Sequence, residues 1–257
     1  MKVICNTFEI ELLNCSIANS YYNISFCIKL KNEMTDTDFC FSFITKLNKR
    51  DLQYISDNFC DLINNNISCF GFKSCDKTLS FHFELKSDGV ISQFEIWKFS
   101  SVNTYYTYSI NMKTDIIFIE KLYDMFNYIK MHGFTNKTDC KFKNSAPLLI
   151  EIFKNIESNN YSLRLQFSEN RIVRKNCLQQ EDIDYLKSQI SMLLAKKILY
   201  FNIESDNLFL SITSFGSDFM VDGEISDFTF PLSNKLKMSG GYPIERDAIY
   251  KIINDQG

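Results

Sequence analysis

Hydrophobic and polar positions alternate with a period of two along much of this chain, a pattern that predicts β-strands. In the segment 21–30, for example, Tyr22, Ile24 and Phe26 fall on one face. The same reasoning gives fourteen expected strands, near 7–14, 21–30, 39–44, 68–74, 78–85, 90–98, 104–112, 149–154, 161–168, 170–174, 198–204, 207–213, 219–226 and 228–238.

Two local signals qualify the last of these strands. Pro231 interrupts the segment 228–238, and a proline lacks the N–H that a central strand donates, so this strand is expected at a sheet edge. Gly240 and Gly241 follow it and are expected to form a turn.

Four segments instead repeat apolar residues at three- and four-residue spacing, which predicts helices. The first begins after Asn48, which can cap the first turn together with Asp51, and it ends at the triplet Asn64-Asn65-Asn66. The others are expected over 116–131, 180–195 and 244–254.

The stretch 47–96 resembles the stretch 178–227, which indicates an internal duplication. The matched residues are Leu47 with Leu178, Asp51 with Asp182, Leu52 with Ile183, Tyr54 with Tyr185, Phe70 with Phe201, Phe72 with Ile203, Leu79 with Leu208, Phe81 with Leu210, Phe83 with Ile212 and Glu95 with Glu224. Two β-rich segments around a helix can also align by chance. The conserved order of elements favours duplication.

The expected fold is therefore α+β, a tandem duplication in which each half is a mainly antiparallel β-sheet packed by helices. The first unit would occupy 1–133, a polar linker 134–147, and a second, shorter copy of the unit 148–257.

Composition places the chain among globular proteins, because 45% of its 257 residues are hydrophobic and 15% aromatic. The net charge is only −3 and no basic stripe is present, so nucleic acid and anionic membranes are poor partner candidates. No apolar stretch is long enough to cross a membrane, and the first residues make a poor signal peptide, so a cytoplasmic location is expected.

Nine cysteines occur without C-x-x-C spacing, and a reducing compartment with free thiols is expected. The chain has only two histidines, His82 and His132, and neither has a nucleophile or orienting acid placed near it by the sequence. Asp222, Glu224 and Asp227 alternate on a predicted strand, which is typical of a solvated face. No catalytic, cofactor-binding or metal-binding residue is predicted, and the chain is not expected to be an enzyme.

The repeated unit carries a family resemblance. Its helix opens as LNKRDLQYISDNFCDLI in one copy and LQQEDIDYLKSQISMLL in the other, and strands such as FNIESDNLFLSITS follow. Two such units in tandem resemble the WapI-like immunity proteins of bacterial polymorphic-toxin systems. The resemblance implies a protein without catalytic residues that binds a cognate toxin domain and blocks it.

Nuclease toxins are often basic, so acidic surfaces are candidates for partner binding. The acidic loop residues Glu33, Asp36 and Asp38 form one candidate, and Asp57 and Asp61 on the first helix form another.

The single tryptophan, Trp97, is a third candidate because tryptophan often anchors interfaces; packing partly into the core is its alternative. Two other functions remain open: a hydrolase with a carboxylate-based site between the two halves, and an interaction module for a different partner.

Overall fold

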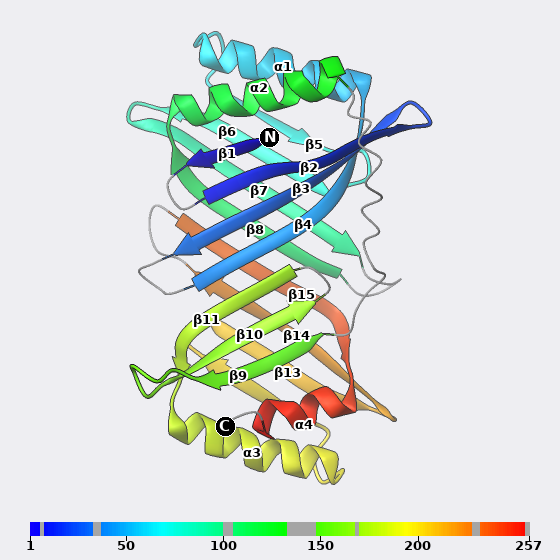
Figure 1. The fold of residues 1–257 in the computed structure, drawn as a ribbon, viewed down its shortest axis with the longest axis vertical. Coiled ribbons are helices and arrows are strands. Elements are labelled where there is room, and N and C mark those ends of the chain that lie inside the picture. Colours follow the sequence, from blue (N-terminus) through cyan, green and yellow to red (C-terminus); the bar gives the residue numbers. More distant parts are fainter. Residues whose placement is uncertain are drawn as a thin grey trace.

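The computed structural model describes residues 1–5, 8–32, 37–99, 105–132, 148–167, 170–227 and 232–254. Its strands form two antiparallel sheets in separate layers, with helices at both ends of the long axis (Figure 1). The expected α+β class and the antiparallel strand pairing are confirmed. The predicted linker, 134–147, lies outside the described residues.

The two sheets contain seven and eight strands. Sheet A runs in the spatial order β1 (Lys2–Cys5), β2 (Phe8–Ala18), β3 (Tyr21–Asn32), β4 (Thr37–Asn48), β11 (Asn170–Leu178), β10 (Tyr161–Phe167) and β9 (Leu149–Lys154). Sheet B runs in the order β12 (Tyr200–Ser205), β13 (Leu208–Phe215), β14 (Asp218–Asp227), β15 (Leu232–Ile244), β8 (Tyr105–Thr114), β7 (Gly89–Phe99), β6 (Leu79–Lys86) and β5 (Cys69–Lys73).

Four helices close the ends of this sandwich: α1 (Lys49–Ile63), α2 (Ile116–His132), α3 (Gln180–Leu194) and α4 (Arg246–Asn254). The predicted cap of α1 is present, because Asn48 Oδ1 accepts a hydrogen bond from the Asp51 backbone N–H at 2.9 Å, and Asp51 Oδ2 accepts one from the Asn48 N–H at 2.8 Å. Helices α1 and α2 lie together at one end, and α3 and α4 lie at the other (Figure 1).

The two halves of the chain meet along a seam of backbone pairing. Strand β4 pairs with β11 in sheet A, where Cys40 lies opposite Arg171, and β8 pairs with β15 in sheet B, where Tyr108 lies opposite Leu236. The expectation that each half builds its own sheet is therefore wrong: each half contributes strands to both sheets. A lone half would leave two long edges unpaired, and the seam removes them.

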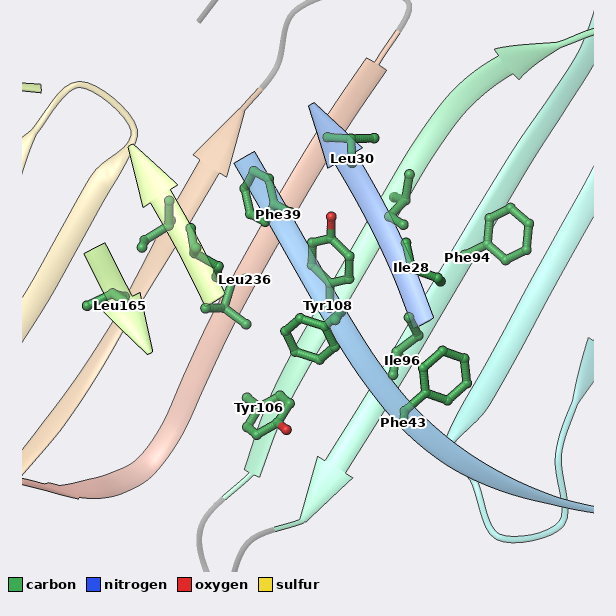
Figure 2. Packing of buried hydrophobic residues seen from close by; sticks show 14 of the residues in the cluster. Ile28, Leu30, Phe39, Phe43, Phe94, Ile96, Tyr106, Tyr108, Leu165 and Leu236 are labelled. Carbon is green, nitrogen blue, oxygen red and sulfur yellow. The ribbon is translucent and has the colours of Figure 1, made fainter. Parts of the chain in front are cut away.

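One continuous hydrophobic core fills the space between the sheets and runs through the seam. Figure 2 shows Phe39 on β4 beside Tyr108 on β8, with Leu165 and Leu236 from the second half nearby. The Phe39 and Tyr108 rings stack with their centroids 5.4 Å apart, and Phe41 stacks on Tyr108 at 4.9 Å. Packing beside the seam thus joins aromatic side chains of sheet A to an aromatic side chain of sheet B.

Strand β15 corrects two of the local predictions. It lies between β14 and β8 and is not an edge strand, and its described residues begin at Leu232, after Pro231. Gly240 and Gly241 do not end it: both have positive φ inside the strand, at 85° and 78°. The Gly241 N–H donates to Asp222 Oδ1 at 2.8 Å, where the β14–β15 register shifts. The two glycines therefore form a bulge where a turn was expected.

None of the helices in the described ranges is long and apolar enough to cross a lipid bilayer.

Candidate functional site

A cavity of about 350 Å³ opens on the outer face of sheet A beside the seam. Its wall includes Glu9 on β2, Lys29 on β3, Asp38 and Cys40 on β4, and Arg171 on β11. It therefore combines side chains from both halves of the chain, and it places a cysteine among charged groups of both signs.

Cys40 lies next to a second cysteine, Cys27. Cys27 pairs with Ser42 and Cys40 with Lys29, so the two cysteines are diagonal neighbours on adjacent strands, and their Sγ atoms are 3.9 Å apart. Hydrogen bonding to Cys40 and burial both raise the pKa of Cys27. The hydrogen bond from the Cys27 thiol, with the positive charges of Lys29 and Arg171, lowers the pKa of Cys40 to about 6.

Ion pairs surround this thiol pair. Glu9 binds Lys2 at 2.7 Å and Lys29 at 3.1 Å, and Lys29 also lies 3.6 Å from Glu11. Partial burial opposes ionisation of Glu9, but the hydrogen bonds from Lys2 and Lys29 lower its pKa overall. The hydrogen bond to Glu9 in turn raises the pKa of Lys29. The charge network therefore keeps an ammonium group close to Cys40.

The acidic residues predicted from the sequence fall in different places. Asp38 lines the cavity, whereas Glu33 and Asp36 lie outside the described residues. On α1, Asp57 accepts a hydrogen bond from Gln53 at 2.7 Å, and Asp61 accepts one from Asn66 at 3.0 Å. Both helix carboxylates are thus held by neighbours close in sequence, and they remain at least partly open to solvent.

Trp97 lies on the outer face of sheet B, because its strand neighbour Ile96 points into the core. Its ring stacks on Tyr105 with centroids 5.7 Å apart. Its Nε1 atom is buried and has no hydrogen-bond partner among the described residues. Because Asp38 and Trp97 lie on the outer faces of opposite sheets, one flat partner surface cannot cover both.

A group of exposed hydrophobic side chains, which the sequence analysis did not single out, lies on sheet B at the end formed by the second half. We call these residues the aromatic patch: Leu199, Tyr200 and Phe215, which are 74%, 61% and 74% exposed, lie at one end of the β12–β13 pair, and Phe209, which is 43% exposed, lies at the other end of β13 opposite Glu204. The Ser214 N–H donates to the Leu199 carbonyl at 2.8 Å, which holds the start of β12 against the end of β13. Exposed apolar side chains on neighbouring strands, such as Tyr200 and its diagonal neighbour Phe215, are typical of protein-binding surfaces.

The corresponding residues of the first half are polar. The matches of Phe70 with Phe201 and Leu79 with Leu208 place four first-half residues at the patch positions: Ser68, Cys69, Ser80 and Lys86. The strand layout is the same in both places, so the fold does not require hydrophobic residues there. This difference between the two halves was the signal in the sequence that could have revealed the patch.

A groove of about 290 Å³ lies between α3 and β12, and Tyr185 lines it. The matched tyrosine of the first half, Tyr54, donates a hydrogen bond to the Gly71 carbonyl at 3.3 Å, and its ring packs against Phe72 with centroids 6.4 Å apart. Ile203 takes the place of Phe72 in the second half. The smaller side chain gives Tyr185 no ring to pack against, although the two tyrosines are similarly exposed, at 53% for Tyr185 and 47% for Tyr54.

The other candidate groups do not converge. His82 projects from the outer face of sheet B, opposite to its buried neighbours Phe81 and Phe83, as its position in the strand predicts. Glu224 pairs with Lys235 at 2.6 Å on the outer face, while Asp227 is buried on the inner side. Within the described ranges, no three side chains of the metal-binding types gather closely enough to hold an ion.

Comparison of the chain with models of protein families, with curated proteins and with solved structures finds no match.

Proposed function

We propose that this protein binds and neutralises a bacterial toxin domain by protein–protein contact, as immunity proteins do, and that its two halves arose by tandem duplication. The proposal rests on repeated local structure, on the resemblance of the repeated unit to WapI-like immunity proteins, and on the aromatic patch. The patch is the observation that carries the binding function.

The repeated local structure supports duplication. The Trp97 N–H donates to the Thr78 carbonyl at 2.9 Å, and at the matched positions the Ser226 N–H donates to the Asn207 carbonyl at 2.8 Å. At the ends of α1 and α3, the matched residues Asn65 and Lys196 have φ of 57° and 56°. Positive φ is uncommon outside glycine, so its recurrence at matched sites supports a common origin.

The pairing of the halves supports it further. Counterpart strands meet at both seams, β4 with β11 and β8 with β15, and the helix in each half separates its sheet A strands from its sheet B strands. Two copies of one unit related by an approximate two-fold axis would produce this arrangement.

The aromatic patch favours a binding function because it costs solubility and is not needed by the fold. Its counterparts Ser68, Cys69, Ser80 and Lys86 occupy the same strand positions without exposed rings. Aromatic side chains contribute a large share of the energy of protein interfaces. The immunity function implies that a toxin domain with a complementary apolar surface binds the aromatic patch.

The hydrolase hypothesis places its carboxylates between the halves. The structure fills that region with strand pairing and with stacked aromatic rings, Phe39 and Phe41 against Tyr108. This arrangement favours recognition through the outer faces over catalysis at the seam.

Co-expression tests the proposal directly. The proposal predicts that the gene immediately upstream encodes the toxin domain. This domain would be induced in bacteria with and without this protein, and colony survival would be counted. We expect the protein to restore survival, and a Tyr200→Ser/Phe215→Ser double variant to restore much less. Lys86→Ala, at the first-half position matched with Phe215, is the control and should protect like wild type. Toxicity that is unchanged by the wild-type protein would refute the immunity function.

A further inference from the structure

We infer that Cys27 and Cys40 form a reversible redox pair on the outer face of sheet A, which low-molecular-weight disulfides convert into a cross-strand disulfide. The inference is independent of the proposed function, because it rests on the geometry of β3 and β4 and on the cavity beside them.

The two thiols differ in access. Cys40 lines the cavity of about 350 Å³ and is partly exposed, whereas Cys27 is only 5% exposed. A reagent as large as glutathione disulfide can therefore reach Cys40 and not Cys27. The geometry assigns Cys40 as the attacking thiol and Cys27 as the resolving thiol.

The charges around the pair favour the same order. Lys29 on β3 and Arg171 on β11 stabilise the Cys40 thiolate, the Cys27 thiol donates a hydrogen bond to it, and Glu9 on β2 opposes ionisation. Asp38 lines the same cavity from β4 and adds a second negative charge. The two cations would also attract the carboxylates of glutathione.

The reaction proceeds in two exchange steps. The Cys40 thiolate attacks one sulfur of glutathione disulfide, forms a mixed disulfide and releases one glutathione thiolate. Cys27 then loses its proton to solvent and attacks Cys40 Sγ, which forms the Cys27–Cys40 bond and releases the second glutathione. The two protein thiols are oxidised, and one glutathione disulfide is reduced to two glutathione molecules.

The bond would be easily reduced. The Sγ atoms are 3.9 Å apart and must approach to about 2.05 Å in a disulfide. Diagonal neighbours on antiparallel strands lie farther apart than the Cβ separation that a relaxed disulfide prefers, so β3 and β4 must shift locally. Strain of this kind raises the reduction potential and makes a disulfide labile. Reduced glutathione in excess should restore both thiols.

Peptide mapping tests the inference on the full chain. The reduced protein would be treated with glutathione disulfide, free thiols would be blocked with an alkylating reagent, and trypsin would cut after Lys29 and Lys31, which separate the two cysteines in sequence. We expect a joined pair of peptides that contain Cys27 and Cys40, preceded in time by glutathione on Cys40. Addition of excess reduced glutathione should remove the joined pair.

Variants assign the roles of the two thiols. Cys27→Ser should trap glutathione on Cys40, and Cys40→Ser should leave Cys27 unmodified. A Cys69→Ser/Cys75→Ser variant, which removes two exposed thiols elsewhere, should still form the joined peptides. The time course uses the wild-type protein alone, so its result does not depend on whether a variant folds. The inference would be overturned if glutathione stayed on Cys40 without cross-linking, or if Cys27 were modified before Cys40. It would also be overturned if Cys27 and Cys40 stayed reduced while Cys69 reacted.

Discussion

The side-chain amide of Asn170 donates a hydrogen bond to the hydroxyl of Tyr106 at 2.8 Å, and this bond joins sheet A to sheet B beside the seam. The other end of the same amide, Oδ1, accepts from the Ser42 backbone N–H at 2.7 Å. Asn170 is fully buried and Tyr106 nearly so, and burial raises the pKa of Tyr106. One side chain from the second half thus satisfies two polar groups of the first half.

Substitution of Asn170 by alanine should therefore destabilise the protein. The change removes both hydrogen bonds and leaves the Ser42 N–H buried without its partner, at a cost of about 2–4 kcal/mol. Urea unfolding followed by circular dichroism would measure the loss. Asn23→Ala, on a partly exposed position of β3, should change the free energy of unfolding by less than about 0.5 kcal/mol. Equal stabilities for the two variants would show that the Asn170 bridge contributes nothing.

A second stability prediction concerns Gly223 in β14. A Cβ atom at this position would lie 2.1 Å from the carbonyl oxygen of Phe209 on β13, far inside van der Waals contact. Gly223→Ala should destabilise the protein by about 1–3 kcal/mol, because the two strands must move apart. Gly71→Ala is the matched control: its nearest atom would be the His82 ring nitrogen at 3.3 Å, and a side chain can adjust more easily than a backbone. Thermal unfolding of both variants would compare them.

The sequence predicted the elements of this fold better than their assembly. Alternation marks strands such as β3 because one face of each sheet is buried, and the Asn48 cap marks the start of α1. Sheet order depends on contacts between residues distant in sequence, so the pairing of Cys40 with Arg171 across the seam left no local signal. A break was expected at Gly240 and Gly241 because two glycines usually mark a turn, but here they accommodate a bulge.

The site was predictable only in part. Cys27 and Cys40 fall on the outer faces of consecutive strands, but their proximity depends on the β3–β4 register, which the alternation alone does not determine. Asp38 was chosen for its charge, and it does line the cavity. The aromatic patch could be found only by comparing the two halves at positions where their residues differ. The similarity of the halves had been recognised from positions where the residues agree.

The lowered pKa of Cys40 predicts the pH dependence of its alkylation. Only the thiolate reacts, so the rate should rise as the pH increases through about 6 and should be nearly constant above pH 7. An unperturbed thiol would instead react at half its maximal rate near a pH of about 8.5. Iodoacetamide labelling with mass spectrometry would give the profile. Cys27→Ala removes the hydrogen-bond donor and should move the midpoint upward; a midpoint unaffected by this change would argue against the donor role of Cys27.

Charge reversal tests the acidic loop as a steering surface for a basic toxin domain. The triple variant Glu33→Lys/Asp36→Lys/Asp38→Lys should slow association several-fold at low salt, and the difference should shrink as the salt concentration rises. Stopped-flow measurements at several salt concentrations would provide the rates. Asp57→Lys on α1, the second acidic candidate, is measured alongside to tell the two surfaces apart. An association rate that the triple variant leaves unchanged would exclude the loop.

The aromatic patch gives the sharpest prediction for affinity, because the first half supplies its own replacement residues. Exchange of Phe209 for serine and Phe215 for lysine, the residues at the matched positions 80 and 86, removes two exposed rings without a known cost to the fold. We expect binding of the toxin domain to weaken by at least about 2 kcal/mol, or about 30-fold, as loss of interface aromatic anchors typically does. Titration calorimetry would measure the affinity and thermal unfolding the stability. The reciprocal change, Ser80→Phe, places a ring on the first half and should leave the affinity unaltered. If the exchanged variant bound as tightly as wild type while remaining folded, the contact surface would have to lie elsewhere on the molecule.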